Sequence, residues 1–217
     1  MIMLSEYPDY TVRERIADGI IHAVGVSGSV VATIIVLSIA MPGLPAHSAV
    51  SLIIYSVAMI AMFCFSAAYH LIPHAHWKGG LKRLDQAAIF LKIAGTYTPF
   101  AVVSLGGLWG YGLLGAVWFV ALFGALTKLF LRNDLGGFTI ALYLALGWAG
   151  IAVIQPLAAS VSPGTLMLIG AGGVLYTIGV IFHLWHSLPY QNAIWHLFVL
   201  VAASCHFAAV IDTVVLV

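Results

Sequence analysis

Charged side chains are scarce in this sequence, because its 217 residues include only eight Lys or Arg and seven Asp or Glu. A soluble domain carries roughly a quarter of its residues as charged side chains, so a soluble fold is excluded. The net charge of +1 and the lack of any run of basic residues argue against a nucleic-acid partner. The two cysteines, Cys64 and Cys205, lie in apolar stretches, and we expect buried thiols rather than a disulfide framework.

Long apolar runs are abundant instead, since 63% of the residues are hydrophobic and the mean hydropathy is +1.10. About 20 apolar residues suffice for a helix that crosses a membrane. Seven such runs are present, separated by turn signals that contain glycine or proline. We therefore predict an all-α membrane protein with a single seven-transmembrane-helix domain over residues 1–217. The predicted helices cover residues 16–40, 49–71, 87–105, 109–131, 138–157, 165–185 and 194–217.

The basic residues predict the orientation of this bundle. Some precede the first run, and others lie between the second and third runs or between the fourth and fifth. Lys92 lies inside the third run, in the half nearer to these basic residues. Basic residues concentrate on the cytoplasmic side, so we predict a cytoplasmic N-terminus and an extracytoplasmic C-terminus. Residues 1–15 are then a polar cytoplasmic segment, and they lack the apolar run of a secretory signal. The basic residues are Arg13, Arg15, Lys78, Lys82, Arg83, Lys92, Lys128 and Arg132.

With this orientation, polar residues far apart in the sequence reach one level near the cytoplasmic face. Ionisable groups inside a membrane are energetically expensive, and they usually face the bundle interior and mark functional sites. Ser66 and His70 are four residues apart, so they share one face of a helix. The full set at this level is Asp18, His22, Ser66, His70, Asp85, Asn192 and His196.

Three of these residues are histidines, and imidazole is the commonest protein ligand of metal ions. His22, His70 and His196 could supply a catalytic zinc site, which keeps three protein ligands and one open position. Structural interpretations stand beside this one. The Ser66 hydroxyl could bond to the carbonyl four residues earlier, and Asp85 could cap the third helix. Asp18 and Glu14, flanked by arginines, are typical of an ordinary charged helix start.

Three motifs and a Leu-Asp pair follow one another along the chain. Ser-Ala-Ala-Tyr-His at 66–70 is followed by Leu-Asp at 84–85, then by Lys-Ile-Ala-Gly-Thr-Tyr-Thr-Pro-Phe at 92–100, and finally by Ala-Ile-Trp-His-Leu-Phe-Val at 193–199. Together they resemble the haemolysin III family, the bacterial branch of the progestin and adipoQ receptors. That family is grouped with alkaline ceramidases in a superfamily of seven-helix, metal-dependent hydrolases. The resemblance extends from about residue 15 to the end of the last run and implies a multi-pass protein of the bacterial inner (cytoplasmic) membrane.

The resemblance implies a role for each motif residue. His70 and His196 would be zinc ligands, whereas Ser66 and Asp85 would be catalytic partners of the activated water and of the reacting carbonyl. His22, with Asp18 one turn before it, matches the polar motif of the family on its first helix.

One position departs from the superfamily. The last helix commonly begins with His-x-x-x-His, but Asn192 replaces the first histidine here. An amide oxygen is a poor zinc ligand, so the third ligand position is open to several alternatives. The site could be lost, could be incomplete with only two histidines or with water at the third position, or could use His22 or Asp85 there. We favour recruitment, because Asp85 lies at the same level and a carboxylate is an acceptable zinc ligand. His206 follows His196 by ten residues, or about 15 Å along a helix, so we expect it to line the outer half of a cavity.

These residues lead to three functional hypotheses. The first is a zinc-dependent hydrolase of membrane lipids, either acyl amides or esters, in which Asp85 accepts a proton and Ser66 stabilises the oxyanion. The second is a non-catalytic membrane-homeostasis or sensor protein braced by zinc. The third, suggested by the family name, is a membrane-lytic protein, and we rank it last because helices three to seven carry no charged stripe that would line a pore.

Overall fold

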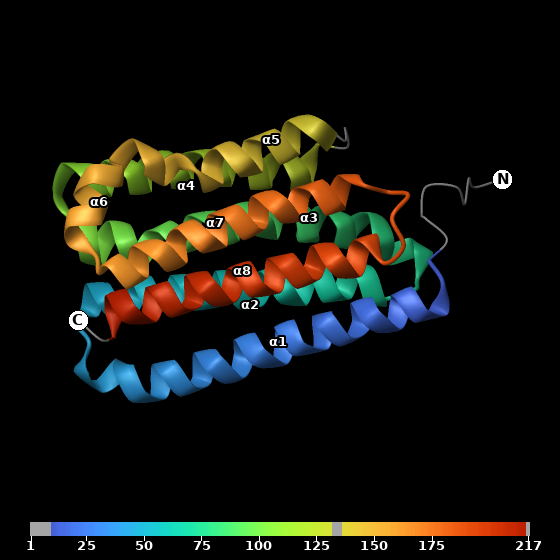
Figure 1. Cartoon of the computed structure of the whole chain (residues 1–217), viewed down its shortest axis with the longest axis horizontal. Helices are drawn as coiled ribbons and strands as arrows, with labels where there is room; N and C mark the ends of the chain where they lie inside the picture. The colour runs from blue at the N-terminus through green and yellow to red at the C-terminus, as the bar shows by residue number, and fades with distance from the viewer. Residues whose placement is uncertain (1–9, 132–135, 216–217) are drawn as a thin grey trace.

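The computed structural model describes residues 10–131 and 136–215, which form helices and turns without any strand (Figure 1). The predicted all-α membrane fold is confirmed. In these residues seven helical spans are long and apolar enough to cross a membrane. The spans are Val12–Gly43, Ala46–Leu71, Ala75–Leu105, Gly107–Phe130, Gly136–Ser160, Pro163–Leu184 and Gln191–Val214.

Four spans are single α-helices, and three contain a change of helix type. The single helices are α2 (Ala46–Leu71), α4 (Gly107–Phe130), α7 (Pro163–Leu184) and α8 (Gln191–Val214). The first span is α1 (Val12–Ala40) with a 3₁₀ turn at Met41–Gly43, and the third is α3 (Ala75–Pro99) with a π-helical turn at Phe100–Leu105. The fifth consists of α5 (Gly136–Gly147), a 3₁₀ segment at Ala149–Val153 and α6 (Ile154–Ser160).

All seven spans begin before their predicted apolar runs, and the difference is largest for α1 and α3. At the start of α1, Thr11 Oγ1 accepts the Glu14 N–H at 3.3 Å and Glu14 Oε2 accepts the Thr11 N–H at 2.8 Å, which makes a capping box. α3 begins at Ala75, so the predicted start of the third helix at residue 87 is wrong. Hydropathy detects only the part of a helix that meets lipid, and α3 continues past it with polar turns. Because the third span begins at Ala75 and ends at Leu105, Lys92 lies near its middle.

The changes of helix type in the third and fifth spans have identifiable causes. Pro99 has no N–H to donate, and the turn after it widens until the Gly106 N–H bonds to the Ala101 carbonyl five residues back, at 3.0 Å. Gly106 has φ 56°, a left-handed conformation that favours glycine. In the fifth span, the Tyr97 hydroxyl donates to the Gly147 carbonyl at 2.6 Å and accepts the Gly150 N–H at 2.9 Å. The irregular backbone is therefore satisfied inside the bundle, as a membrane interior requires.

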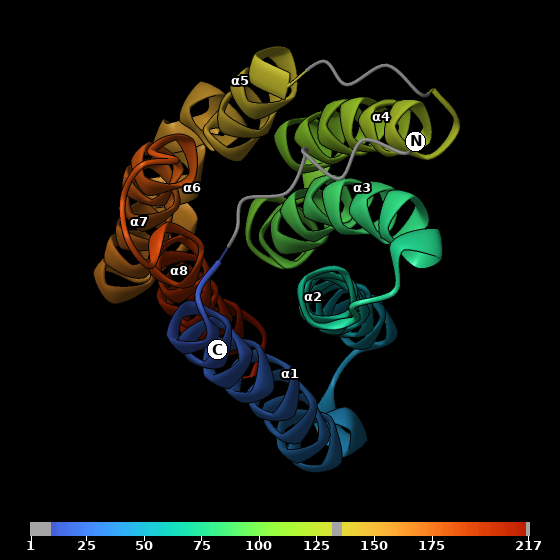
Figure 2. The same cartoon turned by 90° about the vertical axis from the view of Figure 1, so that its right-hand side faces the viewer.

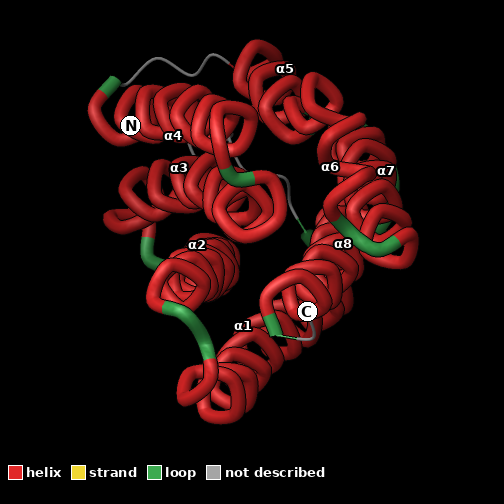
Figure 3. The backbone as a smooth tube through the Cα atoms, turned by 90° about the vertical axis from the view of Figure 1, so that its left-hand side faces the viewer, coloured by secondary structure: helices red, strands yellow, loops and turns green. Residues whose placement is uncertain are grey.

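Seen from either end, the helices form a ring in which the last helix returns to the first (Figures 2 and 3). α1 contacts both α2 and α8, and α7 packs along α8. The start of α1 and the end of α8 lie at opposite ends of the bundle (Figure 1). We call the end that carries Arg13, Arg15 and Lys78 the basic end. The ring brings α1, α2, α3 and α8 together there.

Reporter fusions should test the predicted orientation. We expect a reporter at the N-terminus, or after residue 131, to report a cytoplasmic position, and one after residue 44, 161 or 217 to report an extracytoplasmic position. The reason is that all the basic residues outside the span centres lie at one end, which the cytoplasmic side retains. N- and C-terminal reporters on the same side of the membrane would contradict both the orientation and the count of seven spans.

Candidate metal centre at the basic end

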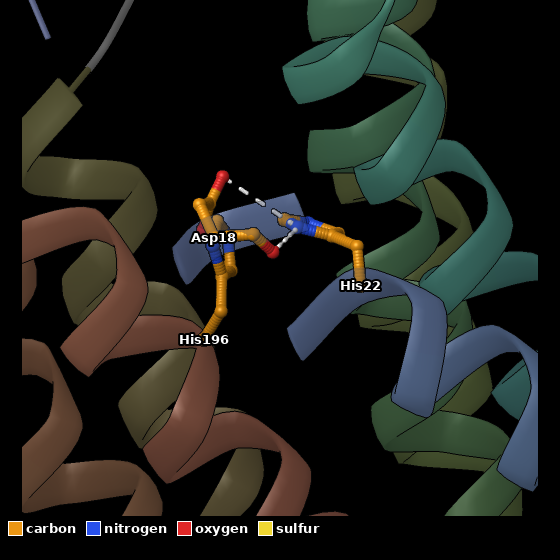
Figure 4. A group of neighbouring side chains, drawn as sticks. All are labelled: Asp18, His22 and His196. Atoms are coloured by element: carbon orange, nitrogen blue, oxygen red, sulfur yellow. Dashed lines mark hydrogen bonds and ion pairs between the residues drawn. The ribbon is translucent and has the colours of Figure 1, made fainter. Parts of the chain in front are cut away.

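Asp18 is the centre of the polar group at the basic end (Figure 4). Its side chain is buried, and His196 Nδ1 lies 2.6 Å from Asp18 Oδ1. His22, one turn later on α1, places Nδ1 3.5 Å from Asp18 Oδ2, and His70 Nδ1 lies 3.9 Å from the same oxygen. Asp18, His22 and His196 form a compact group whose candidate ligand atoms all lie within 4.8 Å of one another. The expectation that Asp18 belongs to an ordinary charged helix start is therefore wrong.

The three histidines come from α1, α2 and α8, and their rings pack against one another. The ring centroids are 4.3 Å apart for His22 and His196, 4.5 Å for His70 and His196, and 5.3 Å for His22 and His70. Protonated imidazoles at such distances would repel strongly, because each would carry a positive charge in a poorly solvated place. Neutral rings, which are the form that binds metal ions, are favoured in this cluster.

Each ring has a protein group at Nδ1. His22 Nδ1 lies 2.9 Å from the Asp18 carbonyl, His70 Nδ1 lies 2.8 Å from the Asn192 side-chain amide, and His196 Nδ1 bonds to the Asp18 carboxylate. Nδ1 of His22 and of His196 faces an oxygen and therefore donates, which leaves Nε2 as the unprotonated nitrogen of these two rings. The Asn192 amide nitrogen is a donor, so His70 Nδ1 accepts from it and the neutral His70 ring carries its proton on Nε2. In the described part of the chain, Nε2 of His70 and of His196 has no hydrogen-bond partner. Such orientation of ligand histidines by outer carboxylate and carbonyl groups is typical of metal sites.

Ser66 and Asp85 lie next to these rings. Ser66 Oγ is 3.3 Å from His22 Nε2, and the Asp85 carboxyl lies near the same hydroxyl. A serine has one proton, so it can donate to only one of these partners at a time. If a metal ion occupied the lone pair of His22 Nε2, the Ser66 proton would be left to Asp85.

The position of Asn192 is not a vacant ligand position. Its amide faces His70 Nδ1, and its nitrogen lies 3.5 Å from Asp18 Oδ2. The structure therefore gives Asn192 the place of an outer partner that orients His70, while His22 brings a third imidazole to the cluster. Asp85 contacts Ser66 and lies outside the compact group, so of the two replacements that we considered the geometry favours His22.

A contact between the start of α1 and the start of α8 holds these residues in register. Glu14 Oε1 accepts the N–H of Tyr190, which has the left-handed φ of 59°. The Tyr10 hydroxyl lies 3.4 Å from Gln191 Oε1. Burial raises the pKa of the Tyr10 phenol, and the negative charges of Asp18 and Glu14 raise it further, so the phenol stays a donor at neutral pH.

The metal centre opens into a cavity of about 1420 Å³ that extends along the bundle interior. Most side chains that line it are apolar, and Ser66, His70, Asp85 and His196 line one part of it. This volume exceeds the roughly 300–1,000 Å³ of pockets that hold drug-sized ligands. His206 also lines the cavity and bonds through Nε2 to the Ile169 carbonyl at 3.2 Å, away from the metal centre.

Comparison with known proteins agrees with this arrangement. The sequence matches the family described as haemolysin-III related over residues 10–207. It is 37% identical over 202 residues to the hemolysin-3 homolog of Bacillus subtilis, which covers 93% of this chain and 95% of that protein. This chain belongs to the haemolysin III family.

A second Bacillus protein and a human protein are also similar to this chain. The hemolysin-3 of Bacillus cereus is 38% identical over 201 residues, covering 92% of this chain and 91% of that protein. The human monocyte to macrophage differentiation factor is 25% identical over 166 residues, or 72% of this chain and 67% of that protein. The family resemblance expected from the three motifs is thereby confirmed.

All four site residues expected from the haemolysin III motifs, Ser66, His70, Asp85 and His196, lie around one cluster. Their catalytic and metal-binding roles remain predictions. Sequence reasoning underestimated Asp18. A signal was present, because Asp18 and His22 are four residues apart and so share one face of α1. The sequence does not show that this face of α1 packs against α8.

Proposed function

We propose that this haemolysin III protein is a zinc-dependent hydrolase of lipid amides or esters that acts near the cytoplasmic face of the membrane. One observation carries the proposal. Three buried or half-buried histidines from three helices surround Asp18, and the neighbouring Ser66 and Asp85 lie beside them at a large, mostly apolar cavity.

The donor set fits zinc, which prefers imidazole nitrogens and carboxylate oxygens in a four-coordinate shell. His22 and His196 would hold the ion through Nε2, which their Nδ1 contacts leave unprotonated. His70 would do the same once the Asn192 amide turns its oxygen toward Nδ1, so that Nδ1 carries the proton. Asp18 and Asn192 would orient the rings. When bound, zinc supplies a Lewis acid that makes water acidic enough to react at neutral pH.

The remaining polar groups have places suited to acyl transfer to water. Asp85 is positioned to accept a proton, and Ser66 is positioned to donate a hydrogen bond to the oxygen of the reacting carbonyl. The cavity beyond them offers apolar walls to an acyl chain, while the headgroup stays at the basic end. Lipid amides and esters combine such a chain with such a carbonyl.

A second function is favoured by one feature. Asp18 belongs to the compact group itself, so its carboxylate could complete a four-donor shell with the three histidines. A closed shell is typical of structural zinc. The protein would then be a non-catalytic, zinc-braced membrane sensor or homeostasis factor.

Asp85→Asn should separate the two functions. We expect purified wild-type protein to hydrolyse members of a panel of N-acyl and O-acyl lipids, and a chelator to abolish the reaction. Asp85→Asn should keep its zinc but lose about 10²- to 10⁴-fold in rate, the usual contribution of a general base. Asp212→Asn is the matched control, since Asp212 accepts hydrogen bonds from Ser162 and Thr165 at the opposite end.

Zinc-edge X-ray absorption adds the coordination shell to this comparison. Three histidine nitrogens with one exchangeable oxygen ligand would support hydrolysis. A closed shell that includes Asp18, in a protein that cleaves nothing in the panel, would support the bracing function. An Asp85→Asn variant as active as wild type would contradict the role proposed for Asp85.

A further inference from the structure

Lys92 is a cation in the middle of the third span, away from the metal centre. It is only 3% exposed. Its Nζ lies 2.6 Å from Thr96 Oγ1 and 4.5 Å from the centroid of the Tyr55 ring. Lys92 follows Asp85 by seven residues, which places it about 10.5 Å further along the helix. It does not take part in the proposed hydrolysis.

The surroundings of Lys92 leave its charge unbalanced. In residues 10–131 and 136–215, no carboxylate lies within ion-pair distance of its Nζ. The Thr96 hydroxyl donates its own proton to the Lys92 carbonyl at 2.8 Å, so it can only accept from Nζ. An ammonium has three N–H groups, and two of them have no acceptor among the described residues. A buried cation without an anion is strongly unfavourable in a membrane interior.

Other polar groups face the same part of the cavity. Lys92, Thr96, Tyr176 and His206, which we call the inner polar group, all line it. The Tyr176 hydroxyl is buried and has no hydrogen-bond partner in the described chain. The Tyr176 ring is 5.6 Å from the His206 ring, and His206 lies near enough to Lys92 for an electrostatic interaction. The cavity thus contains an unsatisfied cation and an unsatisfied hydroxyl, surrounded by mostly apolar walls.

The geometry points to a second binding subsite, in which Lys92 and the Tyr176 hydroxyl bind the carboxylate of a long-chain fatty acid. The inner polar group holds a single fixed cation, which matches the single charge of a carboxylate better than the double charge of a phosphate. The apolar walls of the cavity match the chain. A bound carboxylate would balance the charge of the Lys92 ammonium inside the bundle. This subsite does not rest on the proposed hydrolysis.

Palmitate binding to chelator-treated protein tests the subsite without any contribution from zinc. We expect wild-type protein to bind palmitate and Lys92→Met to bind it roughly 10- to 100-fold more weakly, as expected for lost hydrogen bonds to a charged group. Lys78→Met is the matched control, because Lys78 lies on the same helix as Lys92 and also lines the cavity. It is about 21 Å from Lys92 along α3. Equal affinity in wild type and Lys92→Met would overturn the subsite.

Competing compounds identify the part of the ligand that is recognised. Hexadecanol, which has the same chain without the charge, should bind as weakly to wild type as palmitate binds to Lys92→Met. Acetate and inorganic phosphate should not displace palmitate at millimolar concentration. Displacement by either ion would overturn the fatty-acid assignment in favour of a small anion. Displacement by phosphatidic acid in vesicles, but not by free phosphate, would overturn it in favour of an anionic phospholipid.

A measurement on the wild-type protein remains decisive if Lys92→Met folds poorly. In wild type, a carbodiimide should join bound palmitate to Lys92, because an amide forms between the carboxyl carbon and Nζ while the carboxyl oxygen leaves in the urea. Mass spectrometry would show one palmitoyl group on the Lys92 peptide, and its absence would overturn the subsite. If Lys92→Met does fold, we expect its ligand-free Tm to rise, because a buried cation is removed. A lower Tm with unchanged palmitate binding would instead mean that Lys92 only braces Thr96 and Tyr55.

Discussion

Replacing His70 or His196 with alanine is expected to reduce zinc affinity by more than about 100-fold, beyond the range seen when only an outer partner of a ligand is lost. The reason is that the two rings lie 4.5 Å apart, centroid to centroid, and Nε2 of each ring has no hydrogen-bond partner among the described residues. Metal content after dialysis, followed by competition with a chelator of known affinity, would measure the loss.

His206→Ala is the matched control for this experiment. It also removes one imidazole from α8, but its Nε2 bonds to the Ile169 carbonyl and it lies about 15 Å along the helix from His196. We expect this variant to keep its zinc. If His206→Ala lost zinc as completely as His70→Ala, the metal would lie elsewhere in the cavity than at the basic end.

The second large effect is expected at the third ligand position. His22→Ala should lose zinc as severely as His70→Ala, whereas Asn192→His should not gain affinity and should lose about 10- to 100-fold. Asn192 already fills its place by contacting His70 Nδ1 at 2.8 Å. A histidine there would remove the partner that orients His70, and it would find no vacancy because His22 occupies the cluster.

The same pair of variants can give the opposite answer. Tighter zinc binding by Asn192→His, together with normal binding by His22→Ala, would show an incomplete site with a vacancy at position 192. Chelator competition on both variants measures this directly. Circular dichroism and Tm of each variant serve as the control for folding, because His22 is only 3% exposed and its loss leaves space in the bundle.

The polar residues show where sequence reasoning stopped. Position along a helix predicted that Ser66, His70, Asp85 and His196 share one level, since depth follows from residue number and orientation. The level is confirmed by their arrangement around one cluster. Asp18 was misinterpreted because an acidic residue between arginines is usually solvated. Only the packing of α1 against α8 shows that Asp18 is 7% exposed and faces His196.

The helix boundaries show a similar division. Seven apolar runs predicted seven spans, because crossing a membrane demands length and hydrophobicity that the sequence displays directly. The polar turns at the start of α3 and the changes of helix type after Pro99 and around Gly150 were not predicted. They depend on hydrogen bonds formed between helices, such as those of the Tyr97 hydroxyl to the fifth span.

By itself, then, the sequence determined the class of protein, the number of spans, the family and the level of the candidate site, because each of these depends on composition and spacing along one chain. Only the tertiary structure decided which side chains meet. The rotation of each helix about its own axis and the choice of neighbours depend on packing between distant segments. These two factors placed Asp18 among three histidines, made Asn192 a partner of His70, and left Lys92 in the cavity with no carboxylate partner among the described residues.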